Sequence, residues 1–151
     1  MRGSINWAAK LALWAMALVA CFLVMGPLIY YWKEYTKHYE AGALSSLQAL
    51  HTMQENYMAE KGTYAESFVR LGVPLGASLR GDDLNWGAGY SYRMYDVQRD
   101  LRGRVIGYSI SARPLRYHVG SRKSYLEDQT GTIFMTGEDR AASRHDKIIS
   151  H

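Results

Sequence analysis

Side chains able to perform catalysis or bind metal are few and scattered in this 151-residue chain. The histidines are His38, His51, His118, His145 and His151. His38 and Glu34 share a helix face at a spacing of four residues, as a metal-binding pair would, but such a pair alone is better explained as part of a solvated helix face. The acidic pairs Glu127-Asp128 and Glu138-Asp139 could do acid–base work. Adjacent residues of a strand point to opposite faces, however, and Asp128 suits the start of a turn.

Known catalytic and cofactor motifs are absent from the sequence. There is no phosphate-binding loop, no Gly-x-Ser-x-Gly and no zincin signature. There is no Cys-x-x-Cys-His, and the long apolar run contains no His to act as an axial ligand. We therefore predict a protein that is not an enzyme and that has no cofactor and no metal. An enzyme whose site is assembled from residues outside these motifs is the alternative.

A basic cluster in the second half of the chain is a candidate docking patch. Its members are Arg113, Arg116, Arg122 and Lys123, with His118 nearby. The partner would be an acidic protein surface or lipid head groups, and a solvated surface is the alternative. Residues 33–151 carry 16 basic and 14 acidic groups, a net charge of only +2. We predict no nucleic-acid partner, because such binding needs a stronger field.

The segment from Leu11 to Trp32 contains no charged residue. As a helix it would be roughly 33 Å long, against a hydrocarbon core of about 30 Å. A core helix of a soluble protein would show a polar face, so residues 11–32 are predicted to span a membrane. Arg2 and Lys10 precede the span without an acid. The positive-inside rule therefore places residues 1–10 in the cytoplasm and the remainder on the periplasmic or outer side of a bacterial inner membrane.

Small and aromatic residues mark the span and its outer border. Small residues let helices approach closely, Gly-Pro kinks a helix, and amphipathic rings prefer the membrane interface. The expected packing and kink positions are Ala12, Ala17, Ala20, Gly26 and Pro27, and the expected interface belt is Tyr30, Tyr31, Trp32 and Tyr35.

Two alternatives to a permanent membrane anchor involve cleavage of the N-terminal segment. Leu18-Val19-Ala20-Cys21 matches a lipobox, which would make Cys21 a lipidated N-terminus. A signal peptide is the other alternative. The chain stays apolar from Cys21 to Trp32, whereas a mature lipoprotein usually turns polar, and the run exceeds an ordinary signal-peptide core. These features favour an uncleaved anchor.

Beyond the membrane the helical pattern continues. One stripe contains Ala43, Leu47, Leu50, Met53 and Tyr57 at helical spacing, which predicts a half-exposed helix packed on another element. Gln54 breaks this stripe, and Lys61-Gly62 is a stop signal.

The remaining sequence predicts a loop, a small sheet and a tail. Residues 63–89 are expected to be a loop with a helical turn at 65–71. From residue 90 onward, the sequence alternates with a period of two residues, as in a β-strand. Strands are expected at 90–95, at 105–112 with Ile106, Tyr108 and Ile110 on one face, and at 124–128 and 132–135 around a hairpin turn. The fold class is therefore α+β, with a long N-terminal helix and a three- or four-stranded antiparallel sheet in a domain at 33–140. Residues 141–151 are expected to form a polar C-terminal tail.

In the order of its segments and in several short sequence motifs, the chain resembles the type IV pilin and pseudopilin family over roughly residues 11–140. The segments that carry the resemblance are Ala43–Leu50, Gly62–Ala65, Tyr108–Pro114 and Ser124–Ile133. It implies a membrane helix that continues as the spine of a small domain with an antiparallel sheet. This chain departs from the family at the N-terminal processing site. Gly3 is the only nearby Gly, and Ala8 stands where the family has Glu.

The missing Glu favours a pilin-like domain on a permanent anchor over a filament subunit. We expect a non-enzymatic, single-span accessory subunit of a larger membrane protein complex, with respiratory and photosynthetic complexes as candidate hosts. Its partners would be membrane lipid and other membrane protein subunits. The alternative is a pseudopilin or minor pilin of a type II secretion or type IV pilus system.

Overall fold

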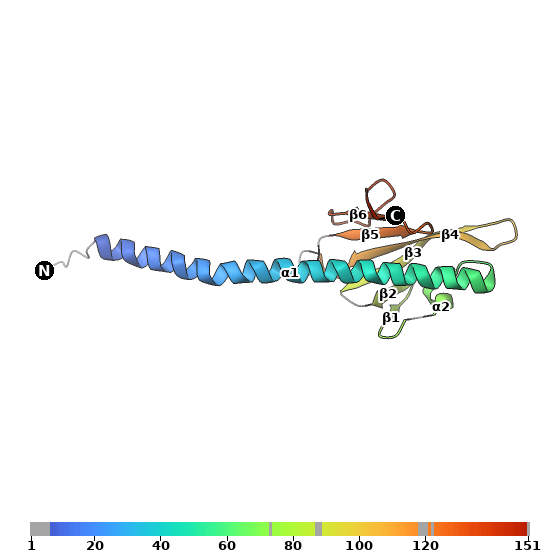
Figure 1. The fold of residues 1–151 in the computed structure, drawn as a ribbon, viewed down its shortest axis with the longest axis horizontal. Coiled ribbons are helices and arrows are strands. Elements are labelled where there is room, and N and C mark those ends of the chain that lie inside the picture. The colour runs from blue at the N-terminus through green and yellow to red at the C-terminus, as the bar shows by residue number, and fades with distance from the viewer. Residues whose placement is uncertain (1–6, 73, 87–88, 118–120, 122, 151) are drawn as a thin grey trace. The chain divides into compact units, whose positions relative to one another are not determined.

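A computed structural model describes residues 7–72, 74–86, 89–117, 121 and 123–150. The chain forms two compact units, residues 1–35 and residues 36–151, and helix α1 (Trp7–Lys61) contributes to both. A short helix α2 (Phe68–Leu71) and seven strands follow. The strands are β1 (Ser78–Arg80), β2 (Asp83–Trp86), β3 (Tyr90–Arg99), β4 (Val105–Pro114), β5 (Ser124–Asp128), β6 (Ile133–Thr136) and β7 (Lys147–Ser150). Each strand pairs antiparallel with the next one in the sequence, so the order in the sheet is the order in the chain (Figure 1).

Helix α1 ends at Lys61, where the sequence predicts its stop, and Gly62 follows with a φ of +69°. Within residues 36–61 the helix buries Ala43, Leu47 and Leu50, which confirms the centre of the predicted stripe. Gln54 is also fully buried. Its side-chain amide donates to the carbonyl oxygen of Ala65 at 3.1 Å and accepts from the Ala65 N–H at 2.9 Å. The residue that breaks the apolar pattern therefore ties the loop after the helix back onto the helix.

Tyrosines dominate the face of the sheet that packs on α1. Tyr90 and Tyr92 of β3, Tyr108 of β4 and Tyr125 of β5 are almost fully buried in one core with the helix stripe. Tyr90 and Tyr92 confirm the period of two predicted for that strand. Burial raises the pKa of Tyr92 to about 12, because its phenolate form would be poorly solvated.

The face predicted for β4, with Ile106, Tyr108 and Ile110 together, is only partly correct. Tyr108 and Ile110 are buried on the face toward α1, but Ile106 is half exposed and Val105 is buried instead. The β3–β4 pairing has register irregularities on either side of Gln98, opposite this part of β4. A bulge of this kind changes which side chains of the strand face the core.

The prediction of three or four strands is wrong, because the described part of the chain contains seven strands in one sheet. β1 and β2 lie within the expected loop at 63–89, and β7 lies in the expected C-terminal tail. All of β1 is exposed, and β2 fully buries only Leu84. These strands are held by ladder hydrogen bonds to a neighbour and bury few side chains. Because they have little buried face to fill, their sequences lack the apolar alternation that marks β3.

The two short local elements agree with the sequence. The helical turn expected at 65–71 is α2, whose start is capped by the Ser67 side chain. The hairpin expected between β5 and β6 is also present. There, the carboxylate of Asp128 accepts from the Thr130 N–H at 3.0 Å, and Gly131 follows with a φ of +77°. Asp128 therefore has the turn role predicted for it.

Candidate functional site

The first part of α1 is apolar and uncovered in the structure. It is the one described helix long and apolar enough to cross a membrane, and none of the side chains in its most apolar window is buried. The predicted packing and kink residues Ala12, Ala17, Ala20, Gly26 and Pro27 all lie here on the exposed surface, with Pro27 inside the helix. Such a segment suits a membrane anchor or a signal sequence. The predicted processing residues Gly3 and Ser4, and the flanking Arg2, lie outside the described residues.

The predicted interface belt is a group of exposed rings on consecutive turns of α1. Tyr30, Tyr31, Trp32 and Tyr35 are all at least 40% exposed. Tyr31 and Tyr35 stack with ring centroids 6.2 Å apart, and Trp32 meets Tyr35 edge-on at 6.4 Å. Aromatic pairs of this geometry order the rings on the helix surface. Their place at a membrane interface stays a prediction.

The members of the predicted docking patch have different surroundings. Arg113 lies on the face of the sheet turned away from α1, which we call the outer face, because it is opposite Ser91 in the β3–β4 register. Lys123 binds α1, where its ammonium group lies 2.7 Å from a carboxylate oxygen of Glu40. Arg116 is exposed, and Arg122 lies outside the described residues. The structure therefore brings Arg113 to the outer face and commits Lys123 to an ion pair with the helix.

One part of the outer face is covered by the segment that joins β6 to β7. Ala142 of this segment packs on Leu126 of β5 and Phe134 of β6 in a small buried cluster. The guanidinium of Arg144 donates to the hydroxyl of Ser109 on β4 at 2.9 Å. The chain after β6 is therefore a folded cover on the sheet.

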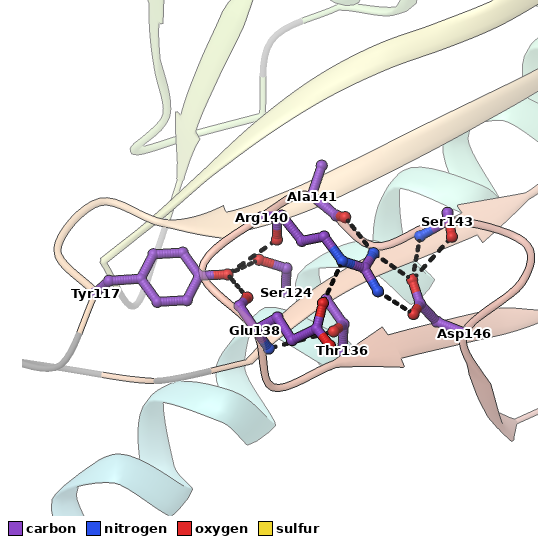
Figure 2. A network of polar contacts seen from close by, with 8 residues as sticks. All are labelled: Tyr117, Ser124, Thr136, Glu138, Arg140, Ala141, Ser143 and Asp146. Carbon is purple, nitrogen blue, oxygen red and sulfur yellow. Dashed lines mark hydrogen bonds and ion pairs between the residues drawn. The ribbon is translucent and has the colours of Figure 1, made fainter.

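Arg140 is the centre of the polar network that holds this cover (Figure 2). Its guanidinium donates to both carboxylate oxygens of Asp146, to Glu138 at 2.6 Å and to the carbonyl oxygen of Ala141 at 3.0 Å. Asp146 also accepts from the N–H of Ser143 at 2.7 Å. These donors, Arg140 first, hold the pKa of the Asp146 carboxyl well below its ordinary value of 3.8.

Tyr117, which follows β4, joins the same network from the other side (Figure 2). Its hydroxyl contacts the hydroxyl of Ser124 and the carbonyl oxygens of Glu138 at 2.8 Å and Arg140 at 3.0 Å. A phenol has one hydrogen to donate, so it bonds one carbonyl at a time and can accept from Ser124. The cover is therefore attached both at Asp146 and at the end of β4.

We expect Arg140→Ala to release residues 137–150 locally while the tyrosine core stays folded. The substitution removes the bonds to Asp146 and Glu138 together, which leaves only the Ala142 cluster, the bond from Arg144 to Ser109 and the contacts of Tyr117 to hold the cover. In the full-length chain in detergent, amide exchange at Ile148 and Ile149 should accelerate by about tenfold or more, with Leu47 and Tyr92 unchanged. Arg102→Ala, at an exposed hairpin arginine, is the control and should change neither region.

The same cover should also loosen in acid. The folded-state pKa of Asp146 is lowered, so its stabilisation is present above pH 3.8 and is lost as the pH falls below that value. The exchange difference between the wild type and Arg140→Ala should shrink over this range. A difference that is independent of pH would contradict the assignment to Asp146.

The uncovered part of the outer face contains a shallow polar groove of about 290 Å³. Its lining comes from β2, β3 and β4 and includes Asp83, Ser91, Arg93, Tyr95, Ser111 and Arg113. Asp83 and Arg93 form two hydrogen bonds of 2.6 and 2.8 Å, in the planar arrangement that a guanidinium and a carboxylate favour. The sequence identified only Arg113 of this group. The others were missed because the groove is formed by polar side chains of three neighbouring strands, which come together only through the pairing of β2, β3 and β4.

The opposite face of the sheet holds a buried acid at its contact with α1. Glu127 pairs in register with Ile110 and Ile133, both buried in the core, and is itself 2% exposed. Its Oε2 atom has no hydrogen-bond partner. Burial, and then the neighbouring Asp128, raise the pKa of Glu127 to about 8. The side chain is therefore mostly protonated at neutral pH.

A second polar pair links α1 to the sheet close to this acid. Nδ1 of His51 lies 2.9 Å from the hydroxyl of Tyr108, and the ring of His51 covers Gly131 in the β5–β6 turn. The negative charge of Glu127 contributes to the raised pKa of Tyr108, after burial. Sequence reasoning missed both Glu127 and His51 as neighbours, because pairing across the helix–sheet contact is not encoded in local spacing.

Comparison with family models, curated proteins and solved structures finds no match to this chain. The candidate sites therefore rest on geometry alone. Within the described residues, no group of three or more His, Cys, Asp or Glu side chains is arranged to hold a metal ion. Glu34 and His38 do not belong to such a group.

Proposed function

We propose that this protein is a single-span, membrane-anchored accessory subunit that acts by binding other subunits of a larger membrane protein complex. The observation that carries the proposal is helix α1, which presents an uncovered apolar surface before Tyr35 and a buried stripe after it. An uncharged helix of this length is suited to lipid and to the apolar helices of neighbouring subunits. The N-terminus would be cytoplasmic and the domain periplasmic.

Binding rather than catalysis is supported by the character of the surfaces on the domain. The groove on the outer face is open and shallow, and its one close acid–base pair, Asp83 with Arg93, is a surface ion pair. The buried acid Glu127 lies inside the helix–sheet core and does not line the groove on the outer face. The small residues Ala12, Ala17 and Ala20 would let a neighbouring helix approach α1 closely.

Purification of the full-length chain from its native membrane in mild detergent tests the proposal. We expect the protein to elute as a complex with defined stoichiometry and to retain its partners through a second chromatographic step. A monomer without a stoichiometric partner, obtained at several detergent concentrations, would overturn the proposal. Retention of residues 1–35 in the purified chain is a necessary part of the expected result.

A pseudopilin or minor pilin is the second candidate, favoured by the order of elements. A long apolar helix whose second part packs on an antiparallel sheet is the arrangement that the pilin resemblance implies. Processing after Gly3, detected by mass spectrometry of the N-terminus, together with incorporation into filaments, would favour this candidate over the first. The Ala8 position, which lacks the family's Glu, argues for the accessory subunit.

A further inference from the structure

The groove on the outer face has hydrogen-bond donors without a partner on its floor. Ser91 of β3 and Arg113 of β4 are opposite each other in the register, and Ser111 of β4 is opposite Arg93 of β3. Both serine side chains line the groove. Among the residues that the structure describes, neither hydroxyl has a hydrogen-bond partner within the protein. Ser111 lines the groove although its side chain is only 2% exposed.

The two arginines of the groove differ in how they are neutralised. Arg93 is fully engaged with Asp83 through two short hydrogen bonds. Arg113 has only a long contact, 4.0 Å from its Nη2 to Oδ1 of Asp139, and both side chains are about half exposed. An exposed ion pair at that distance contributes little to stability, because water screens it. The guanidinium of Arg113 is therefore available to a better-placed anion.

We propose that this groove binds a carboxylate side chain of a partner protein, with Arg113 as the charged donor and Ser91 and Ser111 as hydroxyl donors. The proposal deepens and rests on the proposed function, since it names the chemistry of the segment that the accessory subunit would bind. A planar carboxylate can accept two parallel bonds from a guanidinium. Asp139 is the chain's own weak occupant of this position and competes with the partner's carboxylate.

The charge of the groove fits one carboxylate better than a phosphate group. Asp83 cancels the charge of Arg93, so the groove carries a net charge of about +1 through Arg113. A phosphate dianion would leave one negative charge uncompensated beside Asp83 and Asp139. The groove volume of about 290 Å³ accommodates a single side chain and its flanking backbone.

The test measures binding of a blocked peptide, acetyl-Gly-Glu-Gly-amide, to the full-length chain in detergent by amide chemical shifts. We expect saturable shifts at Ser91, Arg93 and Ser111. Arg113→Gln should weaken binding by about tenfold or more, because it removes a charge-assisted hydrogen bond. Asp139→Asn should strengthen binding by about two- to fivefold, because it removes the internal competitor.

Two further variants and two further probes make the result specific. Ser111→Ala should weaken binding without unfolding the chain, because alanine fits the same space. Arg80→Gln, on exposed β1 outside the groove, is the matched control and should bind as the wild type does. The peptide with Gln in place of Glu should not bind, and inorganic phosphate should bind more weakly than the Glu peptide.

Each contrary result overturns the proposal. Absence of shifts in the wild type, equal binding by Arg113→Gln, binding of the Gln peptide or tighter binding of phosphate would each do so. The accessory-subunit function is tested separately by co-purification. A stable complex without peptide binding would remove only the groove assignment, and peptide binding by a chain without partners would remove only the accessory role.

Discussion

Glu127→Gln is expected to make the domain more stable than the wild type at pH 8.5, by roughly 3 to 5 kcal/mol. In the wild type, Glu127 must carry a charge above its raised pKa of about 8 while buried against α1 with an unpaired Oε2. Glutamine has nearly the same shape and never ionises. The measurement is chemical unfolding of the full-length chain in detergent, followed by fluorescence and near-ultraviolet circular dichroism.

The direction of the pH dependence follows from the raised pKa. A carboxyl whose pKa rises from 4.5 to about 8 on folding holds its proton more tightly in the folded state. Its contribution is therefore fully present below pH 4.5 and declines as the pH rises toward 8. The wild type and Glu127→Gln should be similarly stable at pH 4.5 and should diverge steadily above it. Asp128 and Tyr108, which interact electrostatically with this acid, and His51, which is hydrogen-bonded to Tyr108, are unchanged in the comparison.

An exposed acid provides the control for this experiment. Asp82→Asn also removes one acidic group, but Asp82 lies at the surface between β1 and β2. Its free energy of unfolding should follow that of the wild type across the pH range. If Glu127→Gln were as pH-sensitive as the wild type, the acid would be solvated or paired in solution, and the argument from burial would fail.

The double substitution Leu18→Arg with Phe22→Arg is expected to abolish stable membrane integration. Both side chains are exposed on one face of the uncharged part of α1. Each arginine near the centre of a span costs about 2.5–3.5 kcal/mol in insertion, so the pair opposes insertion by about 5–7 kcal/mol. Alkaline carbonate extraction of membranes should release the variant and leave the wild type in the membrane pellet.

The matched control places the same two charges at the same spacing on the domain part of the helix. Gln48 and Thr52 are exposed on α1 beside the sheet. Gln48→Arg with Thr52→Arg should therefore remain in the membrane pellet. Recovery of the wild type as a soluble chain that lacks its N-terminal segment would instead identify that segment as a signal sequence.

The parts of the fold with a strong apolar period were predictable from the sequence. The stripe of Ala43, Leu47 and Leu50, the end of α1 and the buried side of β3 follow from spacing and stop signals alone. β1 and β7 were not predictable in this way. Strand β1 is wholly exposed, and Ile148 and Ile149 of β7 are adjacent rather than alternating, so neither strand shows a period of two.

The candidate sites were less predictable than the fold, because they depend on pairs distant in sequence. Spacing places Glu127 and Asp128 on opposite faces but does not say which of them faces α1. Arg113 was identifiable as a basic residue. Its weak partner Asp139 and its neighbour Ser91 join it only through the register of β3 with β4 and the path of the chain after β6.

The strictly sequential strand order has a consequence for how the domain forms. Every strand of the sheet pairs with the strand made just before it, so no strand has to wait for a distant part of the chain. The pairing of the strands is therefore local in sequence, and the hairpins close small loops with little loss of entropy. The sheet can therefore grow strand by strand from β1 to β7, with the cover fastened by Arg140 as the last step.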